Sequence, residues 1–155
     1  MRVELTFRAA GLSAVEIRQV VAQVENSSFD TPDSWDEELR VRRVPWVESE
    51  VLVVRGTRLL CGATGNCQVW VFRRAGKQWR STFEKDAPLA SGLGFTDRTT
   101  AGLNDLLLVS SLGGDKDRYT HYRFDGKFYR RAECFDVTAS EGPAADTGVQ
   151  KITCE

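Results

Sequence analysis

The side chains that could do chemistry in this sequence are one histidine, four cysteines and several carboxylates. A general acid or base must exchange protons near neutral pH, and His121 is the one imidazole in the chain. His121 stands between Thr120 and Tyr122 in a predicted strand, where a histidine is typically a structural or surface residue. The sequence has no Gly-x-Ser-x-Gly elbow, and no cysteine has a histidine partner once disulfides are assigned. We therefore expect no catalytic residue.

Paired carboxylates are a second possible source of chemistry, because a glycosidase needs only two of them. The candidates in the C-terminal half are Asp105, Asp115, Asp117 and Asp125. Asp115 and Asp117 follow two glycines and should lie in an exposed loop, where a carboxylate makes a poor general acid. The same oxygens could bind calcium, but no third acidic residue and no glutamate follow at the required spacing. A solvated turn is the simplest interpretation, and a small hydrolase using Asp105 or Asp115 with another carboxylate is the alternative.

The four cysteines favour disulfides over a metal site. Five residues separate Cys61 from Cys67, and the glycines and asparagine among them let this loop fold back on itself. Cys134 follows the last clear strand, and a bond from it to Cys154 would tie down the tail. Three pairings are possible, and we favour these two local ones. A zinc site would need a different spacing of its cysteine ligands. Free structural thiols are the third alternative. We expect no metal and no cofactor.

Disulfides require an oxidising compartment. The opening residues Met1–Glu4 lead into no apolar segment of the kind that a signal peptide contains. Either a leader was replaced by Met1, or the protein is cytoplasmic and its thiols are reduced. We favour the first explanation and expect a periplasmic or secreted protein.

Composition narrows the class of protein further. The chain has 155 residues, of which 41% are hydrophobic and 28% charged, and its net charge is −1. A chain of this length buries roughly 70% of its unfolded surface, so a core is possible without metals or partners. The hydrophobic fraction is too high for disorder, and no apolar run approaches the ~20 residues of a membrane span. The near-zero net charge gives no bulk attraction to nucleic acid.

Arginine dominates the basic residues and supplies sixteen of the 21. Arginine binds carboxylate and phosphate with paired hydrogen bonds and stacks on aromatic rings. Acidic residues are interleaved with the arginines, so solvent-facing arginines on strands are the simplest explanation. A sheet face that combines arginine with aromatic rings could instead bind a partner. The candidate binding residues are Arg73, Trp79, Asp115, Asp117, Arg118, Tyr122 and Arg123.

The elements that must position these residues begin with one helix. Ser13 and Glu16 have the spacing of a capping box, and Leu12 and Ile17 that of a hydrophobic staple. Apolar residues then recur at helical spacing as far as Val24. The pattern predicts a helix over residues 13–25, packed on a sheet.

Residues 37–136 show the period of two that is typical of half-buried strands. The segment Asp105–Val109, apolar after its first residue, predicts a central strand, and Asp125-Gly126 predicts a two-residue hairpin turn. Residues 138–155 have the composition of a surface tail tied by the second disulfide. We predict a single α+β domain over residues 1–155, mainly β. Its one N-terminal helix would pack on an antiparallel sheet or small sandwich of about seven strands.

Three segments carry a resemblance to a group of proteins. They are the loop Cys61–Cys67, the segment Gly102–Leu106 and the hairpin Tyr122–Tyr129. Residues 50–135 resemble small exported bacterial β-rich proteins that have a Cys-Gly-x-x-Gly-x-Cys loop and a Gly-x-x-Asp-Leu strand. The resemblance implies export and a disulfide, and it brings no catalytic residues.

We therefore expect a non-catalytic periplasmic or secreted binding protein whose partner is a protein or an envelope polymer. One form of this expectation is a hydrolase inhibitor, whose exposed loop Leu112–Arg118 would enter the cleft of its target. An immunity protein or an envelope structural protein is a further alternative.

Overall fold

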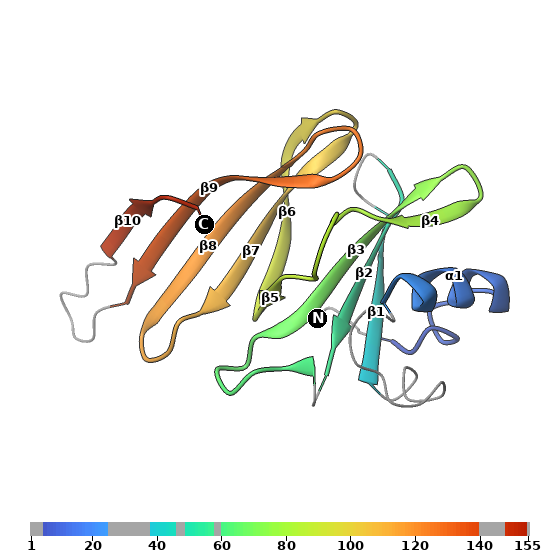
Figure 1. The fold of residues 1–155 in the computed structure, drawn as a ribbon, viewed down its shortest axis with the longest axis horizontal. Helices are drawn as coiled ribbons and strands as arrows, with labels where there is room; N and C mark the ends of the chain where they lie inside the picture. Colours follow the sequence, from blue (N-terminus) through green and yellow to red (C-terminus); the bar gives the residue numbers. More distant parts are fainter. Residues whose placement is uncertain (1–4, 25–37, 46–48, 58–59, 140–147, 155) are drawn as a thin grey trace.

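The computed structural model describes residues 5–24, 38–45, 49–57, 60–139 and 148–154. These residues form one helix and two antiparallel sheets (Figure 1), which confirms the predicted mainly-β fold with a single helix. Ten strands are present in the described residues, against the predicted seven or so. The strands without a predicted counterpart are the two-residue β5 and the strand β10 in the C-terminal tail.

The elements follow one another along the chain as α1 (Ala14–Val24), β1 (Leu39–Val44), β2 (Val51–Gly56), β3 (Cys67–Ala75), β4 (Gln78–Ser81), β5 (Leu89–Ala90), β6 (Gly92–Thr100), β7 (Leu103–Ser111), β8 (Lys116–Phe124), β9 (Tyr129–Thr138) and β10 (Gly148–Ile152). The first sheet has the order β1-β2-β3-β4, with β5 also paired to β3. The second sheet has the order β10-β9-β8-β7-β6. Strand β7 is therefore an interior strand, as its apolar run predicts.

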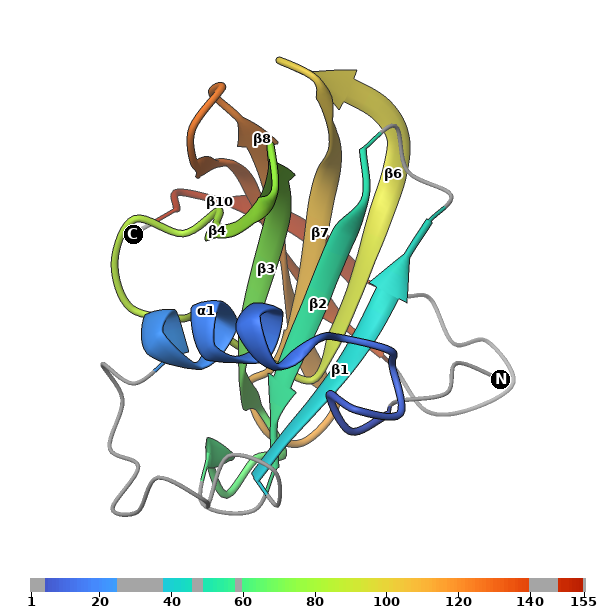
Figure 2. The same cartoon turned by 90° about the vertical axis from the view of Figure 1, so that its right-hand side faces the viewer.

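Helix α1 begins with the predicted capping box. The backbone N–H of Glu16 donates to Oγ of Ser13 at 3.2 Å, and the N–H of Ser13 donates to Oε1 of Glu16 at 3.1 Å. The helix ends at Val24 within the described residues, and Glu25 lies outside them. The apolar stripe of the helix is buried, and α1 crosses one face of the first sheet (Figure 2).

The first sheet has a core on each face, so the molecule has three layers. Strand β2 shows how this arises, because its apolar run alternates between the two cores. Leu52 and Val54 pack under α1, whereas Val51 and Val53 face the second sheet. The second core continues into β7 with Leu106 and other apolar side chains. A continuous apolar run is what a strand buried on both faces requires.

Both predicted disulfides are present, Cys61–Cys67 and Cys134–Cys154, and no cysteine is free. The first ring also binds the second sheet, since Asn66 exchanges two 2.8 Å hydrogen bonds with the backbone of Ser111. Two disulfides are compatible with an extracellular or periplasmic location. The described part of the chain contains no group of side chains arranged to hold a metal ion. It also contains no helix long and apolar enough to cross a membrane.

Two local features differ from the predictions. The turn between β8 and β9 has four residues, because the side chain of Asp125 accepts hydrogen bonds from the N–H groups of Lys127 and Phe128, both at 2.8 Å. Part of the predicted surface tail is strand β10, which pairs with β9 so that Ile152 lies opposite Cys134. The second disulfide holds this tail beside β9. Backbone pairing with β9 makes β10 the edge strand of the second sheet. Residues 140–147 lie outside the described part.

Candidate functional site

The seven predicted binding residues do not form one site. Trp79 is 1% exposed, because its ring lies beneath α1 and its Nε1 donates to Oε2 of Glu16 at 2.7 Å. Tyr122 is buried in the core between the sheets, where its ring meets Phe83 edge to face at 5.6 Å. Desolvation in this position raises the pKa of Tyr122. The predicted exposed aromatic face is therefore largely core.

The segment Leu112–Arg118, predicted as an exposed loop, is a short exposed turn followed by the start of β8. The N–H of Leu112 donates to the carbonyl of Lys116 at 2.9 Å, and β8 already begins at Lys116. Asp115 remains in the turn, while Asp117 lies in β8 opposite Ser111. The exposed part of this segment is the tip of the β7–β8 hairpin. It lies at the opposite end of the second sheet from the turn between β8 and β9 (Figure 1).

Arg118 forms an ion pair with Asp136 on the neighbouring strand. Its Nε lies 2.8 Å from Oδ1 of Asp136, and its second guanidinium nitrogen donates to the other carboxylate oxygen at 3.2 Å. This paired hydrogen bond lowers the pKa of Asp136. Arg118 therefore joins β8 to β9 within the second sheet.

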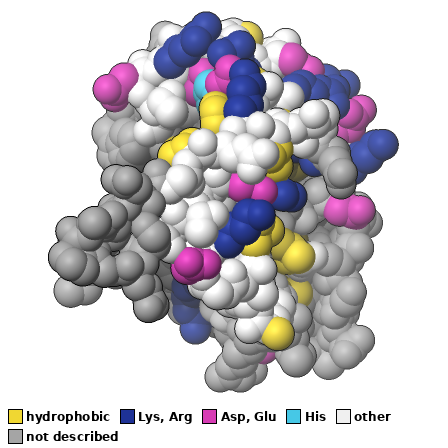
Figure 3. Space-filling view, turned by 90° about the vertical axis from the view of Figure 1, so that its left-hand side faces the viewer, with side chains coloured by type: hydrophobic (Ala, Val, Ile, Leu, Met, Phe, Trp, Pro, Cys, Tyr) yellow, Lys and Arg dark blue, Asp and Glu magenta, His cyan; other side chains and the backbone are white. Residues whose placement is uncertain are grey.

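An unpredicted network surrounds the only histidine. Nε2 of His121 lies 2.9 Å from Oδ2 of Asp105, a residue with no exposed surface, and Thr100 donates to the other oxygen of this carboxylate at 2.7 Å. Nδ1 of His121 lies 3.5 Å from Oε2 of Glu133. Arg123 contributes a longer ion pair to Asp105 at 3.8 Å. On the face of the molecule in Figure 3, the histidine lies among acidic and basic side chains.

This histidine network connects the strands of the second sheet through side chains. Both ring nitrogens of His121 face carboxylates, Nε2 that of Asp105 and Nδ1 that of Glu133. Asp105 has no exposed surface that a substrate could reach. The hydrogen bond from His121, followed by the charge of Lys151, lowers the pKa of Glu133. The network links β7, β8, β9 and β10 across the second sheet.

A different group of residues, of which only Arg73 was a predicted binding residue, forms a hollow where the two sheets meet. We call it the basic hollow; it lies between β4 and the β8–β9 turn and has a volume of about 470 Å³. Its lining consists of Gln23, Arg73, Arg80, Ser81, Phe83, Gly126, Lys127 and Phe128. Three of these residues are cationic, two are aromatic and none is acidic. Such a lining suits an anion that carries an apolar group.

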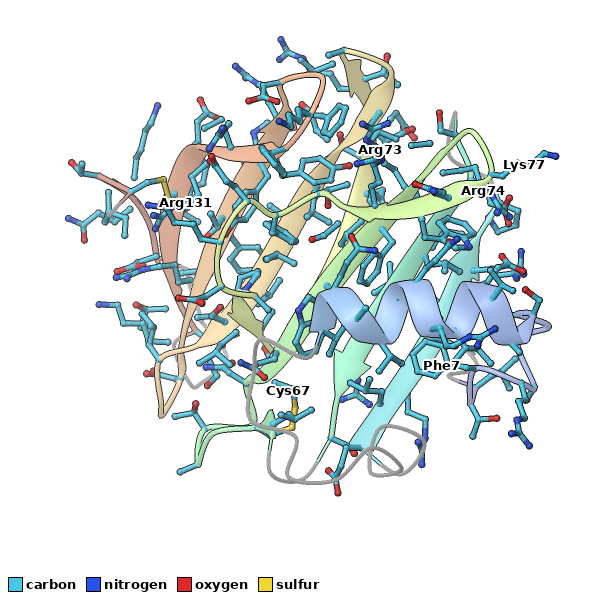
Figure 4. All side chains as sticks on the ribbon, turned by 45° about the vertical axis from the view of Figure 1, so that its right-hand side comes forward. Phe7, Cys67, Arg73, Arg74, Lys77 and Arg131 are labelled. Atoms are coloured by element: carbon cyan, nitrogen blue, oxygen red, sulfur yellow. A yellow bond between two sulfur atoms is a disulfide. The ribbon has the colours of Figure 1, made fainter. Side chains whose placement is uncertain are left out.

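Arg73 and Arg80 are placed in the basic hollow by the hairpin that joins β3 to β4. Their Cα atoms are directly opposite each other in the register of these strands. Nε of Arg73 is buried without a hydrogen-bond partner, and its guanidinium carbon lies 5.4 Å from the ring centre of Phe124. Figure 4 shows Arg73 at the gap between the sheets, whereas the neighbouring Arg74 lies toward the helix side of the first sheet.

Nearby acidic groups bind a different arginine. Asp125 and Glu84 both form ion pairs with Arg130. The backbone N–H of Phe128 contributes most to the lowered pKa of Asp125, about 2, and Arg130 adds to it. Among the described residues, no carboxylate forms an ion pair with Arg73, Arg80 or Lys127. The basic hollow therefore keeps a local excess of positive charge in a protein of net charge −1.

Sequence reasoning identified Arg73 but missed Arg80. The signal was present, because a two-residue turn at Gly76 and Lys77 places residues 73 and 80 opposite each other. No comparable signal in the sequence indicated that Lys127 and Phe128 line the hollow, since they lie in the β8–β9 turn of the other sheet. The partners of His121 likewise depend on the register of three strands.

Comparison with known proteins gives no relative from which a function could be transferred. No protein-family model, no curated protein and no solved structure matches this chain. The resemblance of residues 50–135 to exported bacterial proteins therefore stays a prediction. The basic hollow is the described feature whose chemistry points most clearly to a ligand.

Proposed function

We propose that this protein is a non-catalytic binding protein of the periplasm or the extracellular space. Its partner, a protein or an envelope polymer, presents an anionic group to the basic hollow. The observation that carries the proposal is the pair Arg73 and Arg80, opposite each other on neighbouring strands without a carboxylate between them.

The arginine pair has an energetic reason to take an anion. Like charges directly opposite on adjacent strands destabilise a sheet by roughly 0.2–1 kcal/mol. A buried N–H without a partner, such as Nε of Arg73, adds a further cost. One bound carboxylate or phosphate would accept hydrogen bonds from both guanidinium groups and offset the repulsion between them.

The surroundings of the pair support binding with little rearrangement. The β8–β9 turn is held by the side chain of Asp125, so Lys127 and Phe128 are fixed at the rim of the hollow. Arg73 is braced against the ring of Phe124. A site built on strands and a tight turn loses little backbone conformational entropy when a ligand binds.

Two other observations support this class of function. Both nitrogens of the one histidine face carboxylates, which favours binding over acid–base catalysis. The two disulfides support a role outside the reducing cytoplasm. Inhibition of a hydrolase is a finer form of the proposal, in which the anionic group belongs to the enzyme.

The test is binding of defined anions by the purified, oxidised protein. We expect inorganic phosphate and poly-glutamate to bind, and R73Q and R80Q to weaken poly-glutamate binding at least tenfold by isothermal titration calorimetry. K77Q is the matched control, because Lys77 is an exposed cation on the same hairpin but outside the hollow. Equal losses in R73Q and K77Q would show nonspecific charge attraction and contradict the proposal. Assays with muramidases and proteases then test the inhibitor form.

A further inference from the structure

We infer that the basic hollow recognises one particular anionic group: a carboxylate at the end of an apolar, ring-bearing chain. This inference rests on the proposed function and adds the chemical class of the ligand. Such a group occurs at the free C-terminus of a protein that ends in an aromatic residue, and also in small aryl-substituted acids.

The positive charge of the hollow is arranged for a single anionic group. Arg73 and Arg80 are cross-strand partners, and such partners have Cα atoms about 4.5–5.5 Å apart. Two guanidinium groups at this spacing can each donate to one of the two oxygens of the same carboxylate. Lys127, in the β8–β9 turn, adds a third cation to the lining of the hollow.

The walls of the hollow provide a place for an apolar ring. Phe83 is fixed by its contacts with Tyr122 and Tyr129, at ring-centre distances of 5.6 and 6.1 Å. Phe128 lies at the rim with the cations of Lys127 and Arg130 near its ring, at 5.4 and 5.5 Å. A flat apolar group between Phe83 and Phe128 would gain aromatic contacts while its carboxylate reaches the arginines.

The polar amide in the hollow does not add a second recognition group. Nε2 of Gln23 donates to the carbonyls of Gln19 and Trp79, and Oε1 of Gln23 accepts the N–H of Ser81 at 2.8 Å. These hydrogen bonds use the amide to hold α1 against β4. Recognition therefore depends on positive charge at one end and aromatic surface beside it.

The volume of the hollow sets the size of the ligand. About 470 Å³ lies within the range of small-molecule pockets, roughly 300–1,000 Å³. This space accommodates an end group of one or two residues rather than an extended polymer segment. A terminal carboxylate fits the hollow because it attaches directly to a ring-bearing carbon chain.

The experiment compares ligands that differ in one feature at a time. Calorimetric titrations use 3-phenylpropionate, its amide, and acetate. They also use a short peptide ending in phenylalanine, with a free or an amidated C-terminus. We expect 3-phenylpropionate to bind at least tenfold more tightly than its amide or acetate. If the free-acid peptide binds more tightly than 3-phenylpropionate, the source is a protein terminus. If the protein prefers the acid over the amide for 3-phenylpropionate but not for the peptide, the source of the ligand is a small free acid.

Variants assign the two halves of the ligand to their residues. R73Q and R80Q should lose the preference for the acid over the amide. F128A should lose the preference for 3-phenylpropionate over acetate while acetate still binds. K77Q should change neither preference, and circular dichroism confirms that each variant is folded.

The outcomes separate this inference from the proposed function. Binding of phosphate and poly-glutamate that depends on Arg73, with no gain from the ring, would overturn the inference and leave the proposed function in place. Absence of binding by every anion tested would overturn both. Equal binding of acid and amide would show that the hollow recognises the ring alone and would also overturn the inference.

Discussion

Nε2 of His121 lies 2.9 Å from Oδ2 of Asp105, so the only imidazole in the chain is held by a carboxylate that has no exposed surface. The two residues come from neighbouring strands β8 and β7. The opposite side of the ring faces Glu133 on β9. A scarce and chemically versatile side chain is thus used to join three strands of the second sheet.

Removing this imidazole should destabilise the protein. H121A leaves Asp105 buried with Thr100 as its remaining close hydrogen-bond donor, and an incompletely paired buried polar group costs about 1–3 kcal/mol. Urea unfolding at pH 7 measures the change in the free energy of unfolding. E133Q is the control, because Glu133 lies on the more exposed side of the ring and its neutralisation should cost less. A larger loss in E133Q than in H121A would contradict this description of the network.

The contact between α1 and β4 depends on one amide. Gln23 donates to the carbonyl of Trp79 and accepts from the N–H of Ser81, so it pairs backbone groups of an edge strand. We expect Q23A to lower the free energy of unfolding by about 1–3 kcal/mol, because these groups lose their partner. Thermal and urea unfolding measure this, and R18A on the exposed side of the same helix should change stability little.

Acid should weaken the anchoring of α1 through Glu16. The hydrogen bond from Trp79 is the largest cause of the lowered pKa of Glu16, followed by the bond from the Ser13 backbone. A carboxyl whose pKa is lower in the folded state stabilises the protein above its unfolded pKa, about 4.3 for Glu, and loses this effect as the pH falls. The advantage of wild type over E16Q should therefore shrink between pH 6 and pH 3. A constant difference across this range would contradict the prediction.

Neutralising one arginine of the hollow should stabilise the free protein. R80Q removes a charge directly opposite Arg73, so we expect the free energy of unfolding to rise by about 0.2–1 kcal/mol at low ionic strength. Added salt should reduce the gain by screening the repulsion. K77Q, on the same hairpin, should show no comparable gain. A destabilised R80Q with unchanged K77Q would show that the pair is not repulsive in the free protein.

The two disulfides should differ in their contribution to stability. The Cys134–Cys154 bond closes a loop with a sequence separation of 20, and chain entropy assigns it about 3 kcal/mol. The Cys61–Cys67 bond has a separation of 6, for which the same relation gives about 2 kcal/mol. Paired cysteine-to-alanine variants, compared by urea unfolding, test the order. Loss of the Cys134–Cys154 bond should also increase hydrogen exchange in β10, since Ile152 pairs with Cys134.

Features that depend on neighbouring residues were predictable from the sequence. The capping box of Ser13 and Glu16 spans one helical turn, so its residues determine its geometry almost alone. The Cys61–Cys67 ring is equally local. The β8–β9 turn was harder, because Asp125-Gly126 fits a two-residue turn, yet the Asp125 side chain stabilises a longer one.

By itself, the sequence determined the helix with its apolar stripe, the alternation that makes strands, the local disulfide ring and the arginine-rich basic set. These follow from periodicity and from contacts between close neighbours in the chain. Only the tertiary structure decided that Asp105, His121 and Glu133 meet, and that Lys127 and Phe128 line the same hollow as Arg73 and Arg80. These groupings depend on strand register and on how two sheets pack. Register and packing are set by the burial of many side chains at once, which no single segment specifies.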